Sequence, residues 1–318
     1  MAALRAGLAI RGLNPAETLA AIVRADERGL PMVWSTVGGT NPDAVTLFAA
    51  ALAKTSRIGV GTAIVPTYPR HPVALASQAL VLAGLGPGRF RLGIGPSHRP
   101  TIEGMFGLPM GKPLEHLREY LTVLRGLLWE GAVDFAGTHF TVKAALPAGV
   151  DPPKTPLPIS ALRAGAFRLA GEISDGALSW VCPVPYLINT AKPAMLEGAK
   201  AAGRPFPPLI GHVPVAVGTD REAVRAAVRP QLANYGRLPF YQGMFKDAGF
   251  PVNPDNSLPD ALLDELVVSG TPDEIAARLH QIQDAGVDEL LVMRVNVADP
   301  EAEDAALLDM LARECAGS

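Results

Sequence analysis

Short apolar segments alternate with longer segments of helical period along the chain, and this alternation restricts the possible folds more than any other feature. It is typical of repeated β-α units around a parallel sheet. Eight such units predict an α/β fold, a (β/α)8 TIM barrel with insertions, forming a single domain over residues 1–318. The expected strands are residues 6–10, 31–35, 57–65, 90–95, 157–161, 176–181, 210–217 and 288–295.

Local signals refine this outline. In "SGTPDEIAARL", Thr271 is the expected N-cap of a helix, Pro272 its first residue, and Glu274 completes a capping box. Two segments exceed a minimal barrel: residues 130–146, which predict a β-hairpin, and residues 235–262, rich in Pro, Gly and aromatic residues. Long insertions usually lie at the top of a barrel, so we expect both to shape the substrate site.

Composition and charge exclude several classes of partner. The chain has a net charge of -3, and no run of Lys or Arg exceeds two residues, so nucleic acid and anionic membranes are not expected partners. A small-molecule substrate is the expected partner. The only cysteines, Cys182 and Cys315, are too few for a disulfide framework and fit a reducing compartment. The N-terminal apolar stretch is short and interrupted by Arg, and we expect a cytoplasmic protein.

The chemistry of a TIM barrel lies where its strands end. None of the predicted strand ends carries a carboxylate, which disfavours a barrel glycosidase, because that class needs two. The six histidines are scattered singly, so no metal site is expected. The strand ends are Trp34-Ser35, Thr62-Ala63-Ile64, Gly95-Pro96-Ser97-His98, Ser160-Ala161-Leu162-Arg163, Trp180-Val181-Cys182 and Met293-Arg294.

The loops after the strands combine small residues with groups that can carry positive charge. Small residues let a large planar ligand approach the backbone, and Arg, His and helix N-termini suit phosphate or carboxylate groups. The pattern indicates an anionic cofactor, although surface arginines that only solvate loops would give the same composition. No G-x-G-x-x-G motif follows the first strand and no G-K-[ST] occurs, so a flavin-like ligand remains. The candidate cations are Arg11, Arg70, His71, His98, Arg99 and Arg163.

Residues 58–100, "IGVGTAIVPTYPRHPVALASQALVLAGLGPGRFRLGIGPSHRP", resemble the core signature of the luciferase-like monooxygenase superfamily. The blocks "FRLAGEISDGALSW" (167–180) and "SGTPDEIAARL" (269–279) match two further family blocks in order. With "YGRLPFYQGMF" (235–245), the chain looks most similar to the deazaflavin-dependent (coenzyme F-420) oxidoreductases. Luciferases and alkanesulfonate monooxygenases, which use FMN, are more distant.

The resemblance implies a set of cofactor-binding residues. Thr62 ends the third strand, and Ala63-Ile64 stands where this branch commonly has a non-prolyl cis peptide behind the ring; the alternative is a trans strand end with Ile64 in the core. Leu162 and Arg163 replace the paired glycines of many relatives, so the phosphate contacts are expected to differ in detail. The implied contacts to the ring and ribityl chain are Gly95, Pro96 and Ser97, those to the phosphate Arg163, Ala164 and Gly165, and those on the opposite side Trp180 and Val181.

His98 is the candidate catalytic residue, because some relatives place a proton-transferring carboxylate here and histidine titrates near neutral pH. A loop histidine that only contacts the cofactor tail is the alternative. His71 is assigned to the substrate side, although a structural or tail-binding role suits it better than catalysis. Trp34 and Ser35 are expected to form a wall of the substrate pocket, and Tyr241 to cover it.

The expected function is hydride transfer between carbon 5 of a reduced deazaflavin and a small organic substrate. The cofactor carries the difficult chemistry, so the protein has to position it, exclude water and supply one proton. An FMN-dependent luciferase-like monooxygenase is the alternative enzyme, and a barrel that binds a flavin without turnover is the alternative from another class. The resemblance also implies a homodimer.

Overall fold

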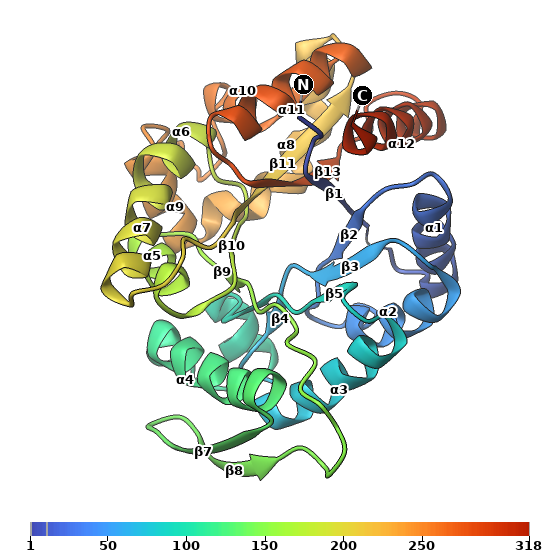
Figure 1. The fold of residues 1–318 in the computed structure, drawn as a ribbon. Coiled ribbons are helices and arrows are strands. Elements are labelled where there is room, and N and C mark those ends of the chain that lie inside the picture. Colours follow the sequence, from blue (N-terminus) through green and yellow to red (C-terminus); the bar gives the residue numbers. More distant parts are fainter. Residues whose placement is uncertain (1, 11, 318) are drawn as a thin grey trace.

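The computed structural model describes residues 2–10 and 12–317, so the predicted cation Arg11 lies outside the described residues. Within these ranges, eight parallel strands form the predicted barrel, and helices surround it (Figure 1). Two of the eight are divided into two segments each. In chain order the strands are β1 (Ala6–Ala9), β2 (Met32–Ser35), β3 with β4 (Gly59–Thr62 and Val65–Pro66), β5 with β6 (Phe90–Arg91 and Ile94–Gly95), β9 (Ile159–Ser160), β10 (Ala177–Ser179), β11 (Leu209–Val217) and β13 (Glu289–Arg294).

The barrel closes because the two divided strands pair with each other along both segments. β3 pairs with β5, and β4 pairs with β6. From β6 the pairing continues through β9, β10, β11, β13, β1 and β2 back to β3. The (β/α)8 prediction and all eight predicted strands are confirmed.

One strand was not predicted. β12 (Val268–Gly270) pairs with Val215–Val217, the carboxyl end of β11. β11 is nine residues long, and it extends beyond its barrel partners there. Three residues are too few to show an alternating pattern, so sequence reasoning could not find β12.

Side-chain caps begin most of the helices that follow strands. Thr271 forms the predicted capping box: Glu274 N donates to its hydroxyl at 3.4 Å, and Thr271 N donates to the Glu274 carboxylate at 2.8 Å. Among the described residues, no helix combines the length and apolar character needed to cross a membrane. The capping residues are Asn14, Asp43, His71, Asp220, Thr271 and Asp299. The helices are α1 (Pro15–Glu27), α2 (Ala44–Lys54), α3 (Pro72–Leu85), α4 (Pro113–Arg125), α5 (Ala164–Ile173), α6 (Val184–Tyr186), α7 (Lys192–Ala201), α8 (Arg221–Leu232), α9 (Pro239–Asp247), α10 (Asp260–Leu266), α11 (Pro272–Asp284) and α12 (Pro300–Ala316), with π-helical turns η1 (Pro100–Met105), η2 (Gly126–Glu130) and η3 (Leu187–Ala191) and the 3-10 turn η4 (Ala233–Arg237).

The two insertions lie in different places. Residues 130–146 form the predicted hairpin, β7 (Ala132–Ala136) paired with β8 (Thr141–Ala145). This hairpin follows the helical turn η2, not a strand, and lies outside α4 (Figure 1). Its turn is held by Glu119 of α4, whose carboxylate accepts backbone N–H groups from residues 138–140. The hairpin is not a connection after a strand as expected, but the ring of Phe140 beside its turn lies 5.7 Å from that of His71 at the start of α3, and the expectation that it shapes the substrate site stays a prediction. η4 and α9 lie in the connection after β11, at the carboxyl end of the barrel.

Candidate functional site

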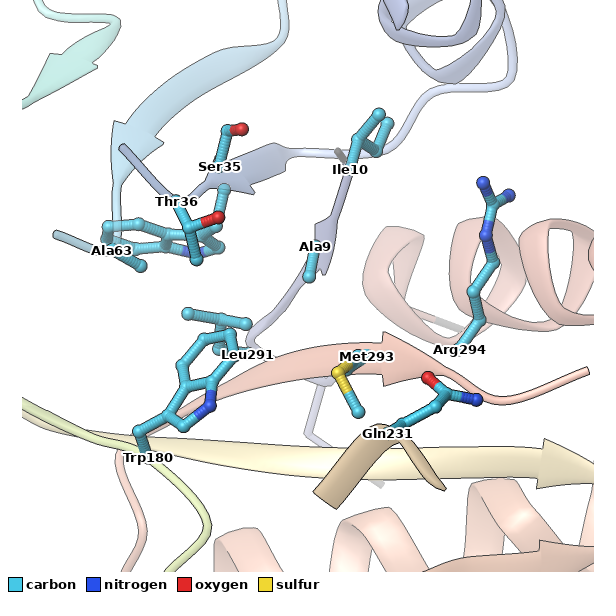
Figure 2. A pocket seen from close by; sticks show the side chains of 11 residues that line it. Ala9, Ile10, Ser35, Thr36, Ala63, Trp180, Gln231, Leu291, Met293 and Arg294 are labelled. Carbon is cyan, nitrogen blue, oxygen red and sulfur yellow. The ribbon is translucent and has the colours of Figure 1, made fainter. Parts of the chain in front are cut away.

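A pocket of about 130 Å³ opens among the carboxyl ends of the barrel strands. Figure 2 shows Trp180, Leu291 and Met293 on one side of it and Ala9 and Ala63 on the other. Seven of the eleven lining residues have apolar side chains, and Ser35, Thr36, Gln231 and Arg294 add polar groups. Most of the lining comes from β1, β2 and β13 and from the residues directly after β3 and β10. The lining residues are Ala9, Ile10, Trp34, Ser35, Thr36, Ala63, Trp180, Gln231, Leu291, Met293 and Arg294.

Trp34 on β2 lies inside the barrel, below the opening, and is fully buried. The adjacent strands carry glycines beside it. A Cβ at Gly61 would lie 2.4 Å from the indole, and a Cβ at Gly7 would lie 2.8 Å from it. Only glycine therefore leaves room for the ring across these strands. Among the described residues, the indole Nε1 has no hydrogen-bond partner, so the pocket is bordered by an available donor.

Trp180, just after β10, is held from two sides. Its ring stacks on His212 of β11, with centroids 3.7 Å apart, and its Nε1 donates to the Tyr235 hydroxyl at 2.6 Å. The backbone N–H of Val181 donates to Nδ1 of the same histidine at 3.3 Å. These contacts fix one apolar wall. Sequence reasoning missed His212, although a single polar residue within the apolar strand LIGHVPVAV was a signal.

The backbone departs from regular geometry at three strand ends. The Ala63–Ile64 peptide is cis, as the family resemblance implies. Ser97, after β6, and Val181, after β10, have φ angles of 62° and 54°. Non-glycine residues in this region cost about 1–3 kcal/mol each, and such conformations cluster at functional sites. Ser97 and Val181 thus place two such conformations at the carboxyl ends of barrel strands, with Val181 next to the pocket residue Trp180.

His98 follows the strained Ser97 and is half-buried. Its ring lies 5.9 Å from that of Tyr241 on α9, measured between centroids. Burial lowers the pKa of His98 below the ordinary histidine value, so the ring is neutral at neutral pH. A neutral imidazole in a partly dehydrated position can accept a proton from a bound molecule.

Aromatic contacts connect His98 to the pocket. Tyr241 is buried, and burial raises the pKa of its hydroxyl well above the ordinary tyrosine value. Its ring lies 4.7 Å from that of Tyr235, which in turn accepts the hydrogen bond from Trp180. Tyr241 lies beside His98 but is not among the residues that line the pocket, and the expectation that it covers the substrate stays a prediction.

The start of α5, like those of α6, α7 and α9, has neither a side-chain cap nor an acidic residue in its first turn. Arg163 is its N-cap residue, but no side chain there accepts a hydrogen bond, and the first turn contains no acidic residue. Ala164 and Gly165 are exposed. The neighbouring α4 also lacks a side-chain cap, but it carries Glu115 in its first turn. An uncapped helix N-terminus with small residues is the arrangement that suits an anion.

The arginines that follow the strands are paired with carboxylates. Arg163 pairs with Asp247 of α9 at 2.7 Å, so its side chain points to the insertion and not freely to a ligand. Arg70 pairs with Asp43 at 2.7 Å. The remaining pairs are Arg294 with Asp304 and Arg99 with Glu103. The positive charge expected at this face is therefore largely neutralised.

The structure brings some of the predicted residues together at the pocket and assigns others to the framework. Trp34, Ser35, Ala63 and Trp180 line the pocket. The Thr62 hydroxyl is buried and donates to the Gly93 carbonyl at 2.8 Å, which joins two strands.

Other predicted residues lie around this lining. The Val181 side chain is fully buried, and His71 caps α3 by accepting from Val73 N at 3.3 Å. Gly95 provides a close approach between strands, because a Cβ there would lie 2.1 Å from the Ser160 hydroxyl and 3.1 Å from Ile64. Pro96 and Ser97 lie between this strand end and His98.

Several lining residues were missed by sequence reasoning. Met293 and Arg294 were recognised as a strand end but given no role. The others needed the closed barrel, which brings β1 and β13 beside each other. They are Ala9, Ile10, Thr36, Gln231 and Leu291.

Other reactive groups do not provide an alternative centre. Burial raises the pKa of the Cys182 thiol to about 12, so it stays protonated and unreactive. The described residues include one group of possible metal ligands, Glu115, Glu119 and His139, with ligand atoms within 4.8 Å of one another. It lies between α4 and the hairpin, and the Glu119 carboxylate is already bound by three backbone N–H groups there.

Comparison with known proteins agrees with this geometry. Residues 3–289 match the family model described as luciferase-like monooxygenase. The F420-dependent glucose-6-phosphate dehydrogenase of Beutenbergia cavernae is 30% identical, over 94% of this chain and 92% of that protein. Two solved structures share the fold: an F420-dependent secondary alcohol dehydrogenase in complex with an F420-acetone adduct (20% identity, 98% of both chains, TM-score 0.81) and the FMN-bound oxygenating constituent of 3,6-diketocamphane monooxygenase from Pseudomonas putida (19% identity, 99% and 98% of the two chains, TM-score 0.72).

Proposed function

Because the chain belongs to the luciferase-like monooxygenase family, we propose that it is an oxidoreductase that transfers a hydride between a deazaflavin coenzyme, F420, and a small organic substrate. The observation that carries this proposal is the pocket at the carboxyl end of the barrel, bordered by small and aromatic residues, with the uncapped and exposed start of α5 after a neighbouring strand. Such a site suits a planar ring with an anionic tail.

The residues present fit such a group. Ala9 and Ala63 present small side chains to the pocket, and Trp34 Nε1 offers a hydrogen-bond donor at its border. Backbone N–H groups of Ala164 and Gly165 would receive the phosphate. This replaces the predicted grip by the Arg163 side chain, since that guanidinium is paired with Asp247.

The remaining assignments rest on the family resemblance. The bound coenzyme would supply the hydride chemistry. Ile64, Gly95, Pro96 and Ser97 would border the ring, with Trp180 and Val181 opposite. His98 would hold or accept one proton of the substrate, and Tyr241 would exclude water above it. Trp34 and Ser35 would wall the pocket; in this proposal His71 supports α3 beside the mouth and has no part in proton transfer.

Two observations favour the deazaflavin over FMN. The relative named as an F420-dependent enzyme matches nearly the whole chain at 30% identity, and the sequence blocks resemble the same branch. An FMN-dependent monooxygenase is the second candidate, supported by the FMN-bound structure with the same fold. We further propose a homodimer and a cytoplasmic location. Exposed apolar residues on α3, Val81 and Leu85, suit a subunit interface.

The open start of α5 provides the test. Gly165→Asp would place a carboxylate where the phosphate is proposed to lie, and an acidic residue in the first turn is compatible with the helix itself. The dissociation constant for F420, measured by ring fluorescence, is expected to rise about tenfold or more, equivalent to about 1.4 kcal/mol. Gly165→Ala is the matched control, because a Cβ there meets only a Leu114 methyl at 3.4 Å. Equal affinity in both variants would contradict this anion site.

A further inference from the structure

We propose that His212 is a positioning residue of this site. Its imidazole holds the Trp180 indole, and with it one wall of the pocket, in the orientation that receives the ring of the coenzyme. What the wall receives rests on the proposed function, whereas the contacts that hold the wall involve the protein alone.

His212 lies inside the barrel, on the same face of β11 as Ile210. It is 2% exposed, and its register partner on β13 is Leu291, which lines the pocket. Ile210 packs in an inner cluster with Trp34 and Leu291. Because side chains alternate along a strand, the imidazole points into the barrel at the level of the pocket wall.

Three contacts join this imidazole to the wall. The ring stacks on the Trp180 indole, with centroids 3.7 Å apart and planes inclined by 23°, so it covers one face of the indole. Nδ1 accepts the Val181 backbone N–H at 3.3 Å, and Nε2 lies 3.4 Å from Sδ of Met293. Trp180 and Met293 both line the pocket and lie on the same side of it in Figure 2. One residue of β11 thus links the side chains that two neighbouring strands present to the pocket.

The hydrogen bond to Nδ1 meets a need of the backbone at Val181. This residue has a φ angle of 54°, which β-branched residues rarely adopt, and its N–H lies beyond Ser179, the last residue of β10. Val181 is fully buried, and a buried N–H without an acceptor is unfavourable. Since Nδ1 accepts this bond, the neutral ring carries its proton on Nε2, directed at Met293. A phenyl ring here would stack without accepting, and an asparagine amide would accept without stacking.

Trp180 needs such support because it lies past the end of β10 and is only half-buried. Its indole N–H donates to the Tyr235 hydroxyl at 2.6 Å, and Tyr235 lies on η4 in the insertion after β11. The insertion therefore holds the edge of the indole, and the barrel holds its face through His212. A wall that is fixed before the ligand arrives lowers the ordering cost of binding.

The first test uses the full-length protein without cofactor and two variants that divide the role of the imidazole. His212→Asn retains an acceptor near Val181 but no stacked ring, and His212→Phe retains a stacked ring but no acceptor. We expect the indole N–H resonance of Trp180, assigned with Trp180→Ala, to shift in both variants while that of Trp129 stays in place. In the unsubstituted protein, the 15N shifts of the His212 ring are expected to report the Nε2–H tautomer.

The second test titrates the same proteins with F420. His212→Asn is expected to raise the Kd about tenfold in the otherwise unsubstituted protein and less than about threefold beside Trp180→Ala, because removal of the indole leaves nothing for the imidazole to position. His280→Asn is the matched control: this histidine on α11 is 6% exposed, contacts Glu314 at 3.0 Å and does not line the pocket. It is expected to leave the Kd and the Trp180 resonance unchanged.

The outcomes separate this proposal from the one beneath it. An Nδ1–H tautomer of His212, or an unchanged Trp180 resonance in both His212 variants, would overturn the positioning role. An equal rise in Kd with and without the indole would also overturn it, because His212 would then act independently of Trp180. Absence of F420 binding by the unsubstituted protein would overturn the proposed function instead, and the Trp180 resonance would still decide whether His212 holds the wall.

Discussion

Glycines in the barrel strands determine the shape of the pocket region mainly because they have no side chain. Gly7 and Gly61 leave room for the Trp34 ring, and Gly93 lets two strands approach at the point where the third strand is interrupted. A Cβ at Gly93 would lie 2.0 Å from the Thr62 carbonyl oxygen, which is backbone and cannot move aside. In the proposed function, His98 is the polar group that holds or accepts the proton.

Gly93→Ala is expected to destabilise the fold by about 1–3 kcal/mol or more, because overpacking against backbone forces the strands apart. Urea unfolding measures the free energy change. Gly84→Ala is the matched control, since a Cβ at this position in α3 meets nothing within 4 Å and alanine favours a helix. Similar stabilities for the two variants would contradict the close packing at Gly93.

His98→Asn should lower kcat about 10²–10⁴-fold, the usual contribution of a general acid or base, while the dissociation constant for F420 stays the same. Burial lowers the pKa of His98 below the ordinary histidine value of about 6.5. The decrease of kcat/KM for substrate oxidation on the acid side should therefore lie below a pH of about 6.5, because the ring becomes protonated there. Weaker F420 binding with unchanged kcat would instead assign His98 to the cofactor tail.

At the scale of elements, α4 joins the hairpin to the strand ends through a buried histidine. His116 stacks on Tyr68 with ring centroids 3.9 Å apart and lies 5.4 Å from the ring of His139 in the hairpin turn. Burial, and secondarily the nearby His139, lower the pKa of His116 to about 4, while Glu119 opposes the shift. The folded state thus binds fewer protons than the unfolded state between pH about 6.5 and 4.

This difference predicts a loss of stability as the pH falls through that window. The unfolded histidine takes up its proton near pH 6.5 and the folded one near 4, so protonation favours unfolding. His116→Phe keeps an aromatic ring on Tyr68 and should remove about 1–3 kcal/mol of the acid-induced loss, allowing for partial solvent screening. Urea unfolding of both proteins at pH 7 and 4.5 measures it. The same loss in the variant would refute the linkage.

The elements differ in how far the sequence could predict them. Parallel strands are buried on both faces, so each is a continuous apolar run that can be recognised locally. The caps at Thr271 and the hairpin at 130–146 are also local signals. The position of the hairpin, the strand β12 and the pairing of Arg163 with Asp247 depend on contacts between distant segments. No pattern of neighbouring residues specifies those contacts.

For the whole molecule, closure of the sheet is the decisive event. It brings β1 beside β13, so that residues near both ends of the chain, Ala9 and Met293, line one pocket. The termini are tied together as well, since Leu4 N donates to the Glu314 carbonyl at 2.9 Å. The predicted residues at the ends of β2, β3 and β10 meet there. The contribution of β1 and β13 became visible only with the closed barrel.

The central claim is that this pocket binds a deazaflavin for hydride transfer. The most direct measurement is a titration of the purified protein without cofactor with F420 and with FMN, followed by ring fluorescence, together with an assay of oxidation of the bound reduced form. We predict tight binding of F420, weak binding of FMN, and oxidation that requires an organic acceptor and not oxygen. Preference for FMN with oxygen-dependent oxidation, or binding of neither ligand, would contradict the claim.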